Sequence, residues 1–188
     1  MLTEEVKKMC TDRIIPDEAR LLAGTDHPSS EGRELFAPET LDFLDELSRA
    51  LRRHSADPET AAFAFWCRRA HLRALRKKHG VSDPEEIQGT GSGPLRLGRG
   101  LLFHLAPANV PMMFAYSWVI GMLAGNAGIV RISERTLRLE NVRAVLDTIR
   151  MLFDRPEYTE VRSRSSFITY DRSDDVTESI LASGRVHV

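Results

Sequence analysis

The chain has 188 residues, with 26 basic and 27 acidic side chains and a formal net charge of −1 at pH 7. This balance gives no electrostatic reason to expect nucleic acid or an anionic membrane as a partner. Two cysteines are too few for a disulfide framework and leave a metal site of the thiolate zinc type unsupported. The charged N-terminus lacks a signal-peptide core, and no apolar run approaches the roughly 20 residues of a membrane span. We therefore expect a cytoplasmic protein.

Residues 1–88 are expected to be a mainly helical N-terminal region. A short helix is predicted over residues 16–23, because acidic residues in its first turn suit the helix dipole. Residues 24–32 are rich in Gly, Pro, Ser and Asp and predict a loop. Leucines recur at steps of three and four between Pro38 and His54, which indicates an amphipathic helix.

A second long helix is predicted from Pro58 to about His79. Asp57 suits the N-cap position, and Gly80 follows the expected end of the helix. Beyond it, three glycines and a proline fall within six residues. We therefore place a flexible connection and a domain boundary at residues 89–99.

From residue 100 onward, buried strands alternate with helices. The predicted strands cover residues 100–105, 128–132, 166–170 and 185–188, and the predicted helices cover residues 111–124, 135–153 and 174–183. This order predicts an α/β fold in which a helical extension precedes a parallel, doubly wound, Rossmann-like sheet. Because the chain stops within a predicted strand, we expect residues 100–188 to be the first part of a larger nucleotide-binding domain.

The turn after the first of these strands carries the strongest indication of chemistry. Pro107 and Pro111 flank Asn109 between a buried strand and a buried helix. In a parallel sheet such a turn lies at the edge where ligands bind, and a fixed amide there can donate a hydrogen bond to an oxyanion. Helix capping is the commoner role of asparagine at a helix start, so spacing alone favours a cap. The Gly-x-Gly-x-x-Gly fingerprint of dinucleotide sites is missing.

A block of motifs from Gly100 to Glu134 resembles the bacterial acyl-CoA reductase family. The block contains Phe-His-Leu-Ala-Pro-Ala-Asn-Val-Pro, then Gly-Met-Leu-Ala-Gly-Asn, then Ile-Val-Arg-Ile-Ser, in that order. The family's best-known member is the fatty acid reductase of the luminescence operon, and the family belongs to the aldehyde dehydrogenase superfamily. The resemblance implies NADPH-dependent reduction of a fatty acyl-CoA or acyl-carrier thioester to the aldehyde through a thioacyl-enzyme.

The resemblance also implies roles for single residues. Asn109 matches the superfamily's oxyanion-binding asparagine. The implied cofactor contacts are Ala106, Pro107, Ala108, Arg131, Ser133 and Glu134. The guanidinium of Arg131 would suit a 2′-phosphate and so favour NADPH, whereas Glu134 could bind ribose hydroxyls and favour NADH.

The nucleophile that the resemblance implies is a cysteine that follows the asparagine in the chain. Cys10 and Cys67 both precede Asn109, and neither matches the motif. Cys67 is expected to be a small core residue, and His104 a core histidine that fixes the turn rather than a base. We therefore expect the chain alone to be inactive.

Two other interpretations stay open beside the enzyme. One is a nucleotide-binding module without chemistry, and the other is an interaction domain whose helices between Pro38 and His79 pack on a partner. For the enzyme, the expected substrate is acyl-CoA or an acyl-carrier protein. A second copy of the chain or an acyl-transferring enzyme are further candidate partners.

Overall fold

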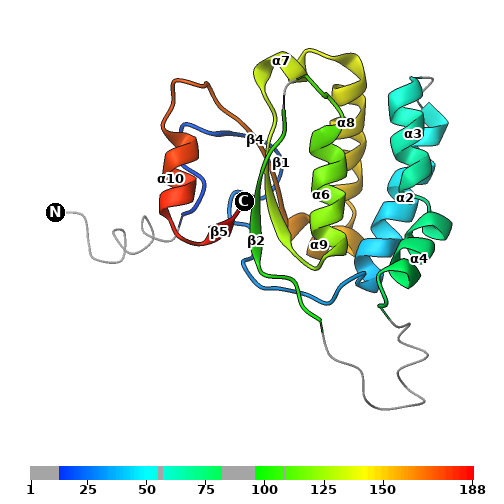
Figure 1. Cartoon of the computed structure of the whole chain (residues 1–188). Coiled ribbons are helices and arrows are strands. Elements are labelled where there is room, and N and C mark those ends of the chain that lie inside the picture. The colour runs from blue at the N-terminus through cyan, green and yellow to red at the C-terminus, as the bar shows by residue number, and fades with distance from the viewer. Residues whose placement is uncertain (1–12, 55–56, 82–95, 108) are drawn as a thin grey trace.

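A single mixed sheet organises the chain (Figure 1). The computed structural model describes residues 13–54, 57–81, 96–107 and 109–188. The strand order is β1-β4-β3-β2-β5, and β2 to β5 are parallel while β1 runs antiparallel to β4. The strands are β1 (Arg20–Gly24), β2 (Leu101–Leu105), β3 (Ala127–Arg131), β4 (Ser165–Thr169) and β5 (Val186–His187). The predicted α/β fold with a helical N-terminal part is confirmed.

Helices cover both faces of the sheet (Figure 1). On one face lie α6 (Met113–Leu123) and α8 (Glu140–Phe153), and on the other lies α10 (Val176–Ala182). An outer layer packs beyond α6 and α8, and it consists of α2 (Pro38–His54), α3 (Pro58–Trp66) and α4 (Arg69–Lys78). Three short elements complete the described chain, namely α7 (Glu134–Leu137), η1 (Pro156–Tyr158) and α9 (Thr159–Ser163).

Two apolar cores hold these layers together. The larger core lies between the sheet and the helices α2, α6 and α8, where Trp118 packs edge-on against Phe167 with ring centroids 4.8 Å apart. The smaller core lies under α10 and includes Phe103, Ile129 and Ile180. Burial of both faces explains why the parallel strands have near-continuous apolar sequences.

The helix predicted over residues 16–23 is wrong. Residues Arg20–Gly24 form the edge strand β1, and only a turn closed by a hydrogen bond from Ala19 N to Pro16 O precedes it. Pairing with β4 outweighs the local helix signal. At the end of β1, a Cβ atom on Gly24 would lie 1.8 Å from the carbonyl oxygen of Ser165. Only glycine allows the two strands to approach this closely.

The long helix predicted from Pro58 to His79 is divided in two. Asp57 does cap its start, because an Asp57 carboxylate oxygen accepts a hydrogen bond from Thr60 N at 2.7 Å. The break falls at Arg68, whose extended backbone (φ −64°, ψ 141°) ends α3 and lets α4 begin in a new direction. Gly80 ends α4 with a φ of +62°, as the glycine position predicts. The helix predicted over residues 135–153 is likewise divided, into α7 and α8.

The order of the strands creates a switch point beside β2. From β2 the chain proceeds through β3 to β4 on one side, and then crosses by α10 to β5 on the other side of β2. In open α/β sheets, ligands bind at the carboxyl ends of the strands where the order reverses. The connection and boundary predicted at residues 89–99 stay a prediction, since residues 82–95 lie outside the described residues.

Candidate functional site

The carboxyl edge of the sheet gathers most of the predicted site. Leu105 of β2 pairs with Arg131 of β3, which pairs in turn with Ile168 of β4. The segments that leave these strands therefore begin side by side. They carry Ala106, Pro107 and Asn109 after β2, Ser133 and Glu134 after β3, and Tyr170 after β4. The predicted contact Ala108 lies outside the described residues.

Asn109 lies in a turn ahead of α6 and does not cap that helix. The N-cap of α6 is Met112, which makes no side-chain cap hydrogen bond, so the capping interpretation is wrong. A hydrogen bond from Val110 N to Pro107 O at 3.3 Å closes the turn around Asn109. The Asn109 side chain is exposed and makes no hydrogen bond with another residue that the structure describes. Its amide is therefore available to a ligand.

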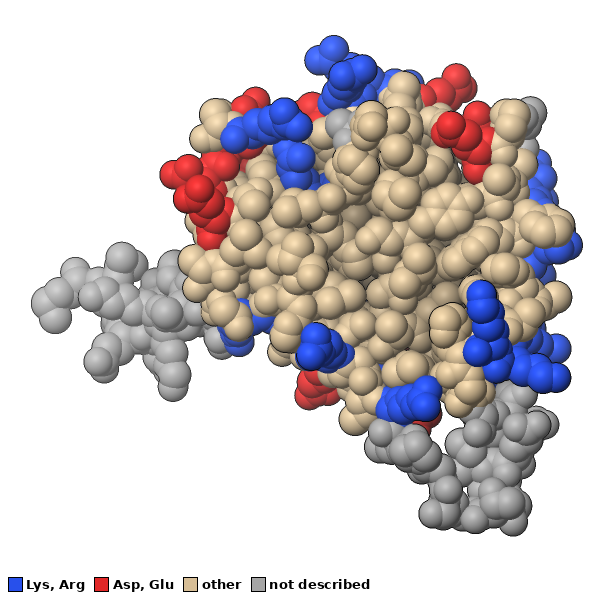
Figure 2. Space-filling model, in the orientation of Figure 1, with Lys and Arg blue, Asp and Glu red and all other residues tan. Residues whose placement is uncertain are grey.

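Apolar side chains surround this turn. Leu105 is 44% exposed, Val110 41% and Met113 40%, although each is hydrophobic. Figure 2 shows that the wider face over β2, β5 and α6 carries few charged side chains and that most of these lie at its rim. An amide at such a surface faces less competition from water than one among charged groups.

Arg131 is held against an aromatic ring. Its guanidinium carbon lies 4.7 Å from the centroid of the Tyr170 ring. The Nε atom of Arg131 is buried and has no hydrogen-bond partner among the described residues. Arg131 as a whole is half-buried, and its guanidinium makes no hydrogen bond with another residue that the structure describes, so it can donate to a ligand oxygen.

Ser133 and Glu134 already have partners. The Oγ atom of Ser133 caps α7 by accepting a hydrogen bond from Thr136 N at 3.1 Å. Glu134 accepts hydrogen bonds from Arg20 of β1 at 2.9 Å and from the hydroxyl of Thr169 at 3.3 Å. The ion pair with Arg20 offsets the charge of the Glu134 carboxylate. Cofactor contacts by these two residues stay a prediction.

A family model described as acyl-CoA reductase (LuxC) matches residues 44–184. The chain belongs to the acyl-CoA reductase (LuxC) family. The resemblance found in the motifs from Gly100 to Glu134 is thereby confirmed. Comparisons with curated proteins and with solved structures gave no match.

Neither His104 nor Cys67 has the properties of a catalytic group in this acyl-CoA reductase family member. Burial lowers the pKa of His104 to about 4, and its Nδ1 atom contacts the hydroxyl of Ser117 at 2.6 Å. The core role predicted for His104 is confirmed, although its partner lies in α6 rather than in the turn. Cys67 is fully buried, and burial raises the pKa of its thiol. It is a core residue as predicted, whereas Cys10 lies outside the described residues.

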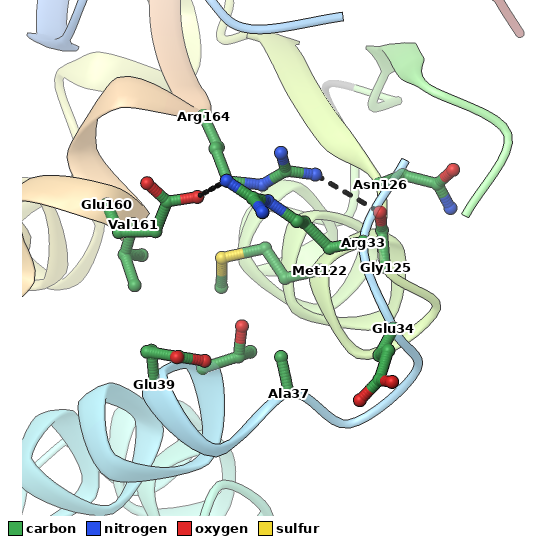
Figure 3. A pocket seen from close by; sticks show the side chains of 11 residues that line it. Arg33, Glu34, Ala37, Glu39, Met122, Gly125, Asn126, Glu160, Val161 and Arg164 are labelled. Atoms are coloured by element: carbon green, nitrogen blue, oxygen red, sulfur yellow. Dashed lines mark hydrogen bonds and ion pairs between the residues drawn. The ribbon is translucent and has the colours of Figure 1, made fainter. Parts of the chain in front are cut away.

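A pocket at the opposite edge of the sheet was not predicted from the sequence (Figure 3). Its volume is about 380 Å³. Arg33 pairs with Glu160 at 2.9 Å, and Arg164 donates to the carbonyl oxygen of Gly125 at 3.1 Å. Glu34 and Glu39 also line the pocket, so its three acidic residues outnumber the two arginines. This pocket lies at the amino ends of the strands, away from Asn109.

The part of the chain that the structure describes contains neither a candidate membrane-spanning helix nor a candidate metal site. None of its helices has the length and apolar character needed to cross a bilayer. The same residues contain no group of three or more His, Cys, Asp or Glu side chains placed to hold a metal ion.

Proposed function

We propose that this chain supplies the oxyanion-binding and cofactor-binding residues of an NADPH-dependent reductase. The enzyme would convert a fatty acyl thioester, carried by CoA or by an acyl-carrier protein, to the aldehyde. The observation that carries the proposal is the place of Asn109. Its exposed amide, which makes no hydrogen bond with another described residue, lies beyond β2 at the switch point of the sheet, in a member of the acyl-CoA reductase family.

Asn109 would act on the carbonyl oxygen of the thioester. Negative charge develops on this oxygen when the carbonyl carbon is attacked, and an amide N–H placed beforehand stabilises that charge. The apolar side chains of Leu105 and Val110 beside it limit the competing hydration. A donor of this kind typically lowers the barrier by about 3–4 kcal/mol.

Arg131 would hold the ribose end of the cofactor. NADPH supplies the hydride when it is bound. The half-buried guanidinium of Arg131 makes no hydrogen bond with another described residue and can donate to a phosphate or hydroxyl oxygen, and the Tyr170 ring lies against it. Arg20 and Thr169 both bind the Oε1 atom of Glu134, so its Oε2 atom could still accept from a ribose hydroxyl. The preference for NADPH therefore rests on Arg131, because a guanidinium suits a 2′-phosphate.

None of the described residues would act as the nucleophile. A thioacyl-enzyme requires a thiolate, and the thiol of Cys67 is buried, with a raised pKa. The chain would thus bind the cofactor and position the thioester oxygen without completing the reaction alone. The same burial favours a second candidate function, namely nucleotide binding without chemistry.

The first test is titration of the chain with NADPH and NADH. We expect saturable binding that is tighter for NADPH. Replacement of Arg131 by Gln should weaken NADPH binding more than NADH binding, whereas Arg162→Gln, which alters an exposed arginine of α9, should change neither. Absence of NADPH binding, or equal losses for both cofactors, would count against the cofactor assignment.

A further inference from the structure

A second pocket lies outside the edge strand β1, between that strand and the helices α7 and α8. Its volume is about 370 Å³. Four arginines line it, and they come from three separate elements: Arg20 of β1, Arg138 at the end of α7, and Arg143 and Arg150 of α8. Basic side chains also gather at the end of the molecule where α7 lies (Figure 2).

Ion pairs with acidic residues of the pocket involve only two of its four arginines. Glu134 and Asp147 are the acidic residues that line it. Glu134 pairs with Arg20 at 2.9 Å, and Asp147 pairs with Arg150 at 2.8 Å. Arg138 and Arg143 make no ion pair with any residue that the structure describes. The pocket therefore carries two surplus positive charges.

The geometry points to a phosphate monoester as the ligand. We propose that this arginine pocket binds the ribose-linked phosphate monoester of a nucleotide, with the 3′-phosphate of CoA as its source. Guanidinium groups bind phosphate oxygens through paired N–H donors, and the two surplus charges match a phosphate dianion. The choice of CoA rests on the proposed function, in which acyl-CoA is a substrate.

The pocket is distinct from the cofactor contact at Arg131, although Glu134, another predicted cofactor contact, lines it. Tyr170, on which Arg131 packs, belongs to the core under α10. Leu22 and Leu146, which line the pocket, belong to the core on the opposite face of the sheet. The chain thus offers two separate positions for a phosphate monoester. In a reaction between NADPH and acyl-CoA, each of the two molecules carries one phosphate monoester.

The experiment compares ligands that differ only in this phosphate. The chain is titrated with CoA and 3′-dephospho-CoA, and with NADP⁺ and NAD⁺. The variant is the double substitution Arg138→Gln with Arg143→Gln, which leaves both ion pairs of the pocket in place. The matched control is Arg73→Gln with Arg162→Gln, which removes two exposed arginines elsewhere. Circular dichroism verifies that all variants are folded.

We expect the unaltered chain to prefer CoA over dephospho-CoA. The double variant should weaken CoA binding by about tenfold or more and leave dephospho-CoA binding unchanged, with the control pair without effect. If the double variant instead loses only NADP⁺ binding, the pocket does bind a phosphate monoester, but that phosphate belongs to the cofactor and not to CoA. Equal binding within both ligand pairs, or an unchanged double variant, would overturn the proposal. If the chain binds CoA more tightly than dephospho-CoA but does not bind NADPH, the proposed function is wrong and the assignment of the pocket to a phosphate is retained.

Discussion

The Nδ1 atom of His104 lies 2.6 Å from the Oγ atom of Ser117, and this contact joins strand β2, which lies between β3 and β5, to helix α6. Glycine makes room for the imidazole on both sides. A Cβ atom on Gly121 would lie 3.0 Å from the His104 Cε1 atom, and one on Gly128 would lie 3.0 Å from its Nε2 atom. The Nε2 atom is buried and has no partner among the described residues. The ring is therefore held in its neutral form.

This burial predicts a stability that falls with acid. The pKa of His104 is about 4 in the folded chain, against an ordinary value of 6.5 that the unfolded chain should retain. Between these pH values the unfolded state binds a proton that the folded state does not. The free energy of unfolding should therefore decrease as the pH falls from about 6.5 to 4, by up to about 3 kcal/mol. Urea unfolding at a series of pH values measures the slope.

Two variants isolate the contribution of His104 to that slope. His104→Gln should flatten it, whereas His187→Gln, at an exposed histidine that makes no ion pair with another described residue, should leave it unchanged. If the His104 variant does not fold, the imidazole proton resonance of the unaltered chain reports the pKa directly. A titration midpoint near 6.5 would refute the burial argument.

Gly98 is predicted to be intolerant of any side chain. It lies where three segments meet, since Gly98 N donates to Arg33 O and Arg33 N donates to Gly125 O, each at 2.8 Å. A Cβ atom on Gly98 would lie 2.1 Å from the Gly125 carbonyl oxygen. Because backbone cannot move aside as a side chain can, Gly98→Ala should lower the free energy of unfolding by about 3 kcal/mol.

Gly80→Ala is the matched control for this effect. Gly80 has a φ of +62°, and a Cβ atom added to it would have no other heavy atom within 4 Å, so only backbone strain of about 1 kcal/mol is expected there. Denaturant midpoints of the two variants provide the comparison. Similar midpoints would mean that the close approach of Gly98 and Gly125 does not limit stability.

The alternation of strands and helices after residue 100 was predictable because its signals are local. Each strand is a short apolar run, and turns such as that at Gly125, with a φ of +77°, contain glycine. Strand β1 was not predictable in this way. It has five residues, and its partner in β4 follows more than a hundred residues later. Only that pairing defines it as a strand.

The candidate site likewise has one part that could be predicted from the sequence and one part that could not. The position of Asn109 after a buried strand follows from the spacing of Pro107 and Pro111, so the sequence placed it at the sheet edge. The contact between Arg20 and Glu134 joins residues 114 positions apart, and no local pattern encodes it. The arginine pocket depends on that contact and on the new direction of α8 after α7. It could be found only in the folded chain.

Cys67 is expected to be inert toward thiol reagents in the folded chain. The residue is fully buried, and burial raises the pKa of its thiol, so both access and thiolate formation are suppressed. Iodoacetamide at pH 8, followed by peptide mass spectrometry, should label Cys67 in urea and leave it unlabelled without urea. Rapid labelling of Cys67 in the folded chain would contradict its assignment as an inert core residue.

Asn109→Ala is predicted to impair catalysis without impairing cofactor binding. In a reductase preparation that contains this chain, loss of the amide donor should lower kcat by about 10²–10³-fold. The Kd for NADPH should change little, because the contacts implied for Ala106, Pro107 and Ala108 are made by their main chain and Arg131 lies on a different strand. Stopped assays of aldehyde formation and NADPH titrations measure the two quantities separately.

Asn141→Ala, which removes an amide that binds Glu59 at 3.1 Å, serves as the control and should leave both quantities unchanged. Full turnover by the Asn109 variant would remove the oxyanion role and leave nucleotide binding without chemistry as the better description.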